Sequence, residues 1–300
     1  MEMVARTCPV CGSNDESHVF AEADFDPANW DRFAFASRKL PEYMHYRLVA
    51  CPVCDLIYAS PIPTLDTLAE AYREADFDSA DEGRRASRTY GAFLPRLVTR
   101  LPDRIGALDI GTGDGAFLEQ LINYGFTEVV GVEPSRAPIA AARSNVRPLI
   151  RHGLFRREDF TSKQLRLITC FQTIEHVYDP FALCRDAHAL LKEDGALFLI
   201  CHDRRALSAR VLGLKSPIFD IEHLQLFSKR SVRFLLERCG FADVVIQNVV
   251  NCYPLHYWWK LFPLPDRPKR VALAALGKTG LGGLPISLPA GNISAIGFKR

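Results

Sequence analysis

The feature that most constrains the fold is an alternation of apolar strand-like and helical segments that starts near residue 105. Strands are predicted at "IGALDIG", "EVVGVEP", "RLITCFQ" and "GALFLIC", and helices over 114–124, 135–145 and 180–192 lie between them. Strands that alternate with helices of this length form βαβ units, so the chain is predicted to be an α/β protein with a parallel sheet. A later helix is predicted over 228–241, capped by Ser228, and two more strands over 242–250 and 292–300.

The first strand-to-helix turn, "LDIGTGDGAFLEQL" (108–121), is rich in glycine. Glycine allows a tight turn and lets the backbone approach a ligand closely, so this loop predicts a nucleotide-type cofactor site. Glu133 ends the next strand, where a carboxylate can accept hydrogen bonds from ribose hydroxyls and would repel a 2′-phosphate. The glycine spacing is not that of a dinucleotide fingerprint, and a glycine turn in another kind of α/β protein is the alternative. The predicted loop residues are Asp109, Gly111, Thr112, Gly113 and Gly115.

Five motifs in order resemble class I S-adenosylmethionine-dependent methyltransferases. They are the glycine loop with "VVGVEPS", then "LITCFQTIEHVYDP", "LLKEDGALFLI" and "IEHLQLFSKRSVRFLLERCGF", which together cover about 105–250. The resemblance implies a Rossmann-like sheet of seven strands, the last two of them antiparallel. It also implies that the loop passes under the methionine part of the cofactor, that Glu133 holds the ribose, that Asp159 and Phe160 lie at the adenine, and that Gln172 lies near the sulfonium. The family often has an acid before its fourth strand, where this chain has Arg166.

Two Cys-x-x-Cys pairs stand near the N-terminus, Cys8 and Cys11 in "CPVCG" and Cys51 and Cys54 in "CPVCD". Together they predict one tetrahedral zinc site, which would be structural because four cysteine ligands leave no open position. A redox pair is the alternative. The segment also resembles the N-terminal zinc-binding part of sugar C-methyltransferases and related enzymes of polysaccharide and antibiotic pathways, where it forms part of the substrate side of the cleft. A nucleic-acid-binding ribbon is disfavoured because the spacer of 39 residues holds many acids.

These patterns predict a zinc-binding module over 1–60, a helical connector over 61–102 and a methyltransferase domain over 103–300. A segment over 251–291, rich in aromatics, proline and glycine, is predicted to form an insertion in that domain. Its stretch "YPLHYWWKLFPLP" is followed by Arg267, Lys269 and Arg270, a combination that membrane-interface elements use. We therefore expect a lid over the site or a peripheral membrane contact through 251–270.

Candidate bases for methyl transfer fall in two stretches. Glu175, His176 and Tyr178 follow the fourth strand, at the sheet edge where ligands bind in open α/β folds, and Glu222 and His223 precede "LQLFS". Either histidine could instead be a structural residue. The resembled sugar methyltransferases use a His/Tyr/Glu cluster near the second stretch, which favours His223 as the base with Glu222 beside it, and His176 and Tyr178 as further candidates.

The predicted function is methyl transfer from S-adenosylmethionine to a small polar acceptor, in the first place a nucleotide- or lipid-linked sugar. O- or N-methylation of a secondary metabolite and a cofactor-binding protein without activity are the alternatives. The formal net charge of +2 gives no argument for a nucleic-acid partner. No signal peptide is visible and no apolar run reaches the roughly 18 residues of a membrane span, so a cytoplasmic location is expected, with the membrane contact as an option.

Overall fold

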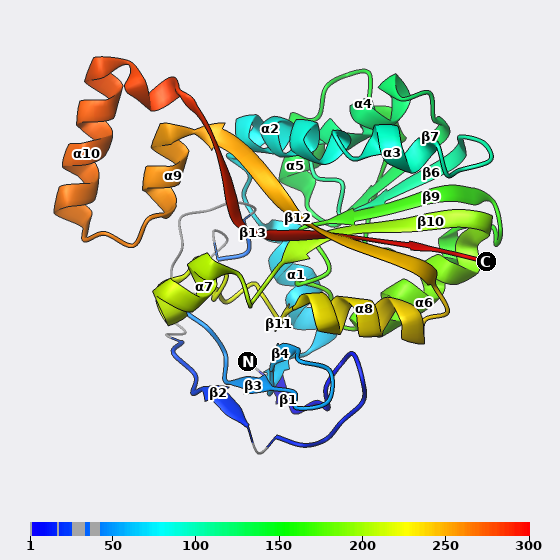
Figure 1. Cartoon of the computed structure of the whole chain (residues 1–300), viewed down its shortest axis with the longest axis horizontal. Helices are drawn as coiled ribbons and strands as arrows, with labels where there is room; N and C mark the ends of the chain where they lie inside the picture. The colour runs from blue at the N-terminus through cyan, green and yellow to red at the C-terminus, as the bar shows by residue number, and fades with distance from the viewer. Residues whose placement is uncertain (1, 17, 26–33, 37–42) are drawn as a thin grey trace.

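The computed structural model describes residues 2–16, 18–25, 34–36 and 43–300 (Figure 1). Its centre is a seven-stranded sheet in the order β12-β13-β10-β9-β6-β7-β8. The strands are β6 (Ile105–Ile110), β7 (Thr127–Glu133), β8 (Ile150–His152), β9 (Leu165–Phe171), β10 (Leu191–His202), β12 (Ala242–Pro254) and β13 (Pro285–Phe298). The strands from β6 to β10 run parallel, and β13 is antiparallel to both β10 and β12. The predicted α/β fold with an antiparallel last pair is confirmed.

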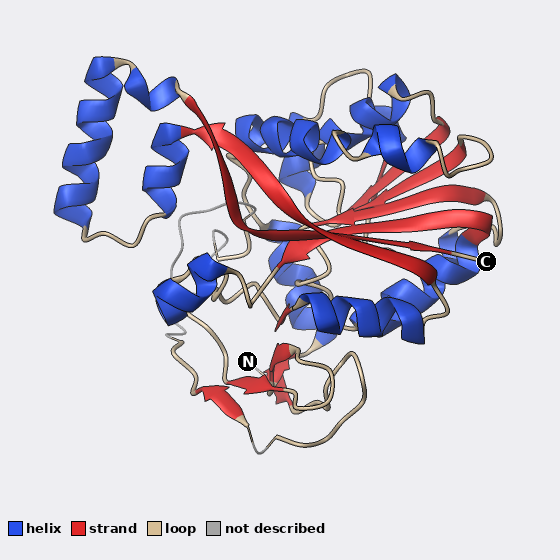
Figure 2. Cartoon of the chain, viewed as in Figure 1, coloured by secondary structure: helices blue, strands red, loops and turns tan. Residues whose placement is uncertain are grey.

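Helices cover both faces of the sheet, which gives three layers (Figure 2). One face carries α2 (Ala80–Gly91), α3 (Leu94–Val98) and α4 (Ala116–Asn123), and the other carries α6 (Pro180–Leu190) and α8 (Lys229–Arg238). Strand β10 shows how the sequence builds this core, because Phe198 and Ile200 pack on the first face while Leu197 and Leu199 pack on the second. Both faces are buried, so the strand is a continuous apolar run.

The helices α2 and α3 come from the predicted connector, yet they pack in the core of the sheet. Tyr90 of α2 packs edge-on against Phe171 at the end of β9, with ring centroids 5.1 Å apart. The domain boundaries at 60 and 102 stay predictions. In α8, the predicted cap is confirmed: the Ser228 hydroxyl accepts a hydrogen bond from the Ser231 backbone and the Ser231 side chain accepts one from the Ser228 backbone.

The last two strands are longer than predicted. Prolines at 254 and 285 and the glycine at 291 are typical of loops, yet β12 and β13 pair as far as Pro254 and Pro285. Beyond Asn292 this two-stranded ribbon pairs only with itself in the described chain, so its outer edges tolerate proline. The three-residue strand β8 is too short for a sequence pattern and was missed.

The ribbon carries a helical appendage made of α9 (Leu255–Leu261), α10 (Asp266–Thr279) and the 3-10 turn η5 (Leu281–Gly283). Figure 1 shows this appendage projecting beyond the end of the sheet. The helix α7 (Leu207–Leu212) and the turn η4 (Gly213–Lys215) lie next to the ribbon. Among the helices of the described chain, none combines the length and apolarity that a membrane span requires.

The N-terminal part forms two small sheets. Strands β2 (Val19–Ala21), β3 (Leu48–Ala50) and β4 (Ile57–Ala59) form one sheet, and β1 (Met3–Val4) pairs with β5 (Ile62–Pro63). The first sheet is completed by β11 (Gln225–Leu226), which comes from the second half of the chain and lies antiparallel to β4. Helix α1 (Leu65–Glu74) follows. The remaining short elements are α5 (Arg136–Ala141), η2 (Arg147–Leu149) and η3 (Arg157–Asp159).

Candidate active site

The glycine loop joins β6 to α4 and lines the main cavity of the described chain, which has a volume of about 1080 Å³. Gly111, Gly113 and Gly115 all have positive φ, which favours glycine. A side chain at Gly111 would collide with Thr173, whereas one at Gly113 would point into open space. The loop is therefore packed on the sheet at one glycine and leaves bare backbone toward the cavity at another.

Two carboxylates hold this loop. Glu133, at the end of β7, accepts the backbone N–H of Gly113 at 2.8 Å and that of Ser135 at 2.9 Å. Asp109 accepts the hydroxyls of Thr112 at 2.8 Å and Thr169 at 2.6 Å. Burial raises the pKa of Asp109 to about 6 and raises the pKa of Glu133. Each Glu133 oxygen keeps acceptor capacity beyond its one bond, so the carboxylate can still take ribose hydroxyls.

Gln172, directly after β9, has an unusual position. Its φ is +49°, which is strained for a residue other than glycine. Its side chain lines the cavity, and its Nε2 has no hydrogen-bond partner within the described chain. A buried amide donor facing a cavity fits a bound ligand, which agrees with the cofactor prediction made for this residue.

The two residues predicted to contact the adenine do not line the main cavity. Asp159 and Phe160 line a smaller depression next to Arg151, whose guanidinium carbon is 5.1 Å from the centre of the Phe160 ring. Leu154 and Phe155 line the main cavity in this region. The adenine contact of Asp159 and Phe160 stays a prediction.

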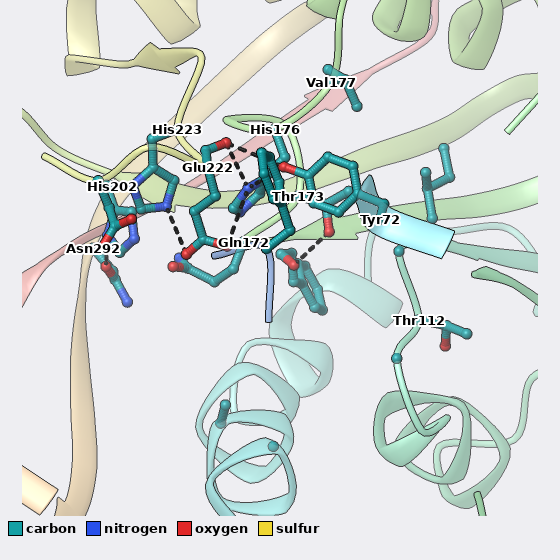
Figure 3. A pocket seen from close by; sticks show the side chains of 18 of the residues that line it. Tyr72, Thr112, Gln172, Thr173, His176, Val177, His202, Glu222, His223 and Asn292 are labelled. Carbon is teal, nitrogen blue, oxygen red and sulfur yellow. Dashed lines mark hydrogen bonds and ion pairs between the residues drawn. The ribbon is translucent and has the colours of Figure 1, made fainter. Parts of the chain in front are cut away.

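Of the candidate bases, His176, Glu222 and His223 lie together at the other side of the cavity (Figure 3). Glu175 is fully buried and is not among the residues that line it. The Glu222 carboxylate lies between two imidazoles, 3.8 Å from Nδ1 of His176 and 4.0 Å from Nε2 of His223. The two rings have centroids 4.8 Å apart. Residues nearly fifty positions apart in sequence thus form one cluster, and these three side chains are also close enough together to hold a metal ion.

Hydrogen bonds to carbonyl groups set the tautomer of His223. Its Nδ1 lies 2.9 Å from the Ile218 carbonyl oxygen, which can only accept, so Nδ1 carries the proton. In the neutral imidazole the lone pair is then on Nε2, the nitrogen that faces Glu222. An imidazole in this state can take a proton, and the neighbouring carboxylate would stabilise the resulting cation. Tyr178 lines the same cavity, but the hydrogen bond described for it is a backbone one.

Sequence reasoning missed several residues of this cluster. The Tyr72 hydroxyl lies 3.1 Å from Nδ1 of His176 and donates to the Glu222 carbonyl oxygen at 3.2 Å. Leu65, Leu68 and Tyr72 follow helical spacing and all line the cavity, which is the signal that could have found them. His202 was missed as well, because only the fold brings its ring to 5.0 Å from that of His223.

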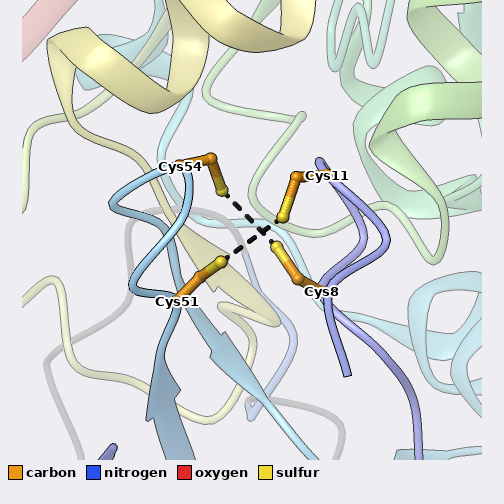
Figure 4. Close-up of side chains that lie close together, drawn as sticks. All are labelled: Cys8, Cys11, Cys51 and Cys54. Carbon is orange, nitrogen blue, oxygen red and sulfur yellow. Dashed lines mark hydrogen bonds between the residues drawn. The ribbon is translucent and has the colours of Figure 1, made fainter. Parts of the chain in front are cut away.

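The four predicted zinc ligands meet at one point (Figure 4). The sulfur atoms of Cys8 and Cys54 are 3.5 Å apart and those of Cys11 and Cys51 are 3.4 Å apart. Four sulfurs at about 2.3 Å from one metal would lie about 3.8 Å apart, so the observed cluster fits a zinc ion after a small expansion. The residue directly after each pair has a positive φ; these residues are Gly12 and Asp55.

The segment 1–60 that contains the four cysteines, here called the cysteine module, is hydrogen-bonded to the loop that carries Glu222 and His223. The Arg6 guanidinium donates to the carbonyl oxygens of Ala59, Tyr178 and Leu224 at 2.6 to 3.1 Å. It also donates to Oε1 of Gln225 at 3.1 Å. One side chain of the module therefore bridges both stretches that hold the candidate bases.

Comparison with known proteins gives one family. The family described as "Methyltransferase domain" matches residues 82–246. Ubiquinone biosynthesis O-methyltransferase of Actinobacillus pleuropneumoniae serotype 5b is 30% identical over 160 residues, 47% of this chain and 66% of that protein. The protein of the same name from Histophilus somni is 33% identical over 118 residues, 35% of this chain and 49% of that protein. The chain thus spans about half to two thirds of the length of these relatives.

Among solved structures, the YcgJ protein of Bacillus subtilis is similar in fold. It is 18% identical, with a TM-score of 0.50, and the match covers 70% of this chain and 99% of that one. At this level of identity the likeness concerns the arrangement of the sheet and its helices.

Proposed function

Because the chain belongs to the methyltransferase-domain family, we propose that it transfers a methyl group from S-adenosylmethionine to a small polar acceptor. The observation that carries the proposal is one cavity that contains both the bare backbone of Gly113 and the cluster of His176, Glu222 and His223. Bound S-adenosylmethionine supplies a methyl group on a positively charged sulfur, which an acceptor atom displaces in line. The protein then has to align the two partners and exclude water.

The residues of the loop side would hold the cofactor. The Gly113 backbone leaves room for close approach, and Glu133 would accept the ribose hydroxyls. The Nε2 of Gln172, which has no partner among the residues that the structure describes, would face the methionine part. Carboxylates at Asp109 and Glu133 give this half of the cavity a negative character, which suits a cationic ligand.

His223 would act as the base. Its unprotonated Nε2 takes the acceptor proton, and Glu222 stabilises the imidazolium that forms. A sugar derivative is the proposed acceptor, because the cysteine module resembles that of sugar C-methyltransferases and contributes Phe35 to the cavity wall. The names of the curated relatives, ubiquinone biosynthesis O-methyltransferases, favour O-methylation as a second candidate. The same base serves both reactions, since either acceptor must lose a proton.

We also propose that Cys8, Cys11, Cys51 and Cys54 bind one structural zinc ion. The ion would fix the positions of the two cysteine pairs in the module. Arg6 would then hold the loop of Glu222 and His223 in place through its hydrogen bonds to Leu224 and Gln225. All four ligand positions are taken by thiolates, so this metal has no part in the chemistry.

Calorimetry with S-adenosylmethionine tests the cofactor half. We expect micromolar affinity, roughly −8 kcal/mol. Gly113→Val should weaken binding because its side chain enters the space left for the ligand, and Glu133→Ala should weaken it by removing the ribose acceptor. Gly280→Val, at an exposed glycine that also has a positive φ and open space around the added side chain, is the matched control. Unchanged affinity in both loop variants would refute the assignment.

The role of His223 is tested on whichever acceptor takes up tritium from methyl-labelled S-adenosylmethionine. His223→Ala should lower turnover roughly 100-fold or more, the usual effect of removing a general base, with cofactor affinity nearly unchanged. If His176→Ala is crippling and His223→Ala is mild, His176 is the base.

A further inference from the structure

The cavity extends well beyond the two sites described so far. At about 1080 Å³ it lies just above the roughly 300–1,000 Å³ usual for one ligand. Past His202 and His223 its wall is formed by α7 and α9, which pack on the β12–β13 ribbon. We call this part of the cavity, lined by α7 and α9, the second chamber; it lies beyond the residues assigned above to the cofactor.

Apolar side chains dominate the wall of this chamber. The lining residues that the argument uses are Leu207, Val211 and Leu212 of α7 and Tyr257, Trp258 and Leu261 of α9. Leu207 is 75% exposed and Val211 is 73% exposed, so the rim is apolar as well. The Trp258 indole N–H donates to the Ile286 carbonyl oxygen at 3.0 Å, which satisfies the polar edge of that ring within the ribbon. An apolar ligand that covers this wall would be stabilised, because apolar surface on both sides is removed from water.

The charged residues that line the cavity disfavour the binding of an acceptor with several negative charges. Among the described residues that line it, Arg156 is the only lysine or arginine, and it lies at the cofactor end. Carboxylates outside the cofactor loop include Asp76, Asp179 and Asp220. A diphosphate would need paired cations to offset its lost hydration, and the described walls of the second chamber contain none.

Neutral polar groups mark the boundary between the second chamber and the catalytic cluster. Asn251 is 2% exposed, lines the cavity, and its Oδ1 has no hydrogen-bond partner within the described chain. Asn292 also lines the cavity, with its Oδ1 2.8 Å from Nδ1 of His202. Neutral amides rather than charged groups therefore stand where the apolar walls meet the catalytic cluster.

We propose that the second chamber binds the apolar body of the acceptor, and that the acceptor is an uncharged amphiphile. Its hydroxyl-bearing head lies between Asn251 and the Glu222–His223 pair, and its apolar body lies against Leu212, Trp258 and Leu261. This inference rests on the proposed function. It selects, among sugar derivatives, those joined to an apolar group over those joined to a nucleoside diphosphate.

The test is calorimetry on the full-length protein saturated with S-adenosylhomocysteine, with hexyl, octyl and decyl β-glucoside below their micellar concentrations. Affinity should rise about fourfold with each added methylene, which corresponds to the burial of one CH₂. One molecule should bind per chain, and glucose and uridine diphosphate glucose should bind more weakly than octyl glucoside. Affinity that is independent of chain length, or tighter binding of uridine diphosphate glucose, would overturn the inference.

Two matched substitutions control for detergent binding elsewhere. Val211→Arg places a cation at the rim of the chamber and should weaken octyl glucoside about tenfold. Val271→Arg makes the same change on α10, at a valine that is 70% exposed and outside the cavity lining, and should have no effect. Equal effects of the two would overturn the inference. Failure of S-adenosylhomocysteine to bind would instead refute the proposed function, and the inference with it.

Discussion

Glu175 offers a sharp test of the electrostatics beside the candidate base, through the variant Glu175→Gln. The side chain is fully buried, and its Oε1 accepts the backbone N–H of His202 at 2.7 Å. Its Oε2 has no partner in the described chain. Burial raises the pKa of Glu175 from 4.5 to about 7. The folded protein therefore holds this proton more tightly than the unfolded chain does.

The sign and size of the effect follow from that difference. The stabilising contribution of the protonated carboxyl is complete below pH 4.5 and is lost as the pH rises through 7. The full loss is about 3 kcal/mol, at about 1.4 kcal/mol for each pH unit between the two pKa values. Between pH 5 and pH 8.5 the wild type should lose about 2.5 kcal/mol of unfolding free energy through this group. Glutamine does not titrate, so the variant should lack this loss.

The pH dependence of the unfolding free energy is measured by urea unfolding, followed by circular dichroism at pH 5, 7 and 8.5 in reducing buffer. Asp109, whose pKa is raised to about 6, is present in both proteins and cancels from the comparison. Glu237→Gln, at an exposed position of α8, is the control and should follow the wild type. If the pH dependence of Glu175→Gln matches the wild type to within about 0.5 kcal/mol, burial does not raise the pKa of this carboxyl and the reasoning fails.

Three further predictions concern the rest of the chain. Cys8→Ser should remove the one zinc ion found per chain by metal analysis; metal-free wild-type protein, purified without chelators, would contradict the site. Arg6→Met deprives four acceptors of their donor and should lower the unfolding free energy by about 2–4 kcal/mol with cofactor affinity unchanged, whereas the exposed Arg233→Met should have little effect. We propose that 251–270 contacts membranes, because Phe262 is 51% exposed on a basic appendage. The protein should then sediment with anionic vesicles at low salt and be released at high salt, and equal recovery in the supernatant with and without vesicles would exclude the contact.

Local signals were sufficient for much of the cofactor side. The glycines at 111, 113 and 115 need positive φ, and an acid at the end of the next strand is a neighbour by the geometry of a βαβ unit. The Cys-x-x-Cys pairs likewise carry their own short-range geometry, and the structure brings them together. These features are readable because each is built from short motifs whose partners follow from a known unit, although the cysteine pairs lie 40 residues apart.

Only the tertiary structure brought the residues of the proposed acceptor side together. Tyr72, His176, His202 and Glu222 come from four separate segments, and no local pattern links them. The same holds for the chamber between α7 and α9, whose two helices are joined through the long β12–β13 ribbon. The sequence by itself predicted most strands of the sheet, the glycine loop and the cysteine cluster, because their periodicity and spacing are visible in short segments. Single candidate residues were visible in motifs, but how they meet at the proposed acceptor site depends on long-range packing of apolar surfaces, which is non-directional.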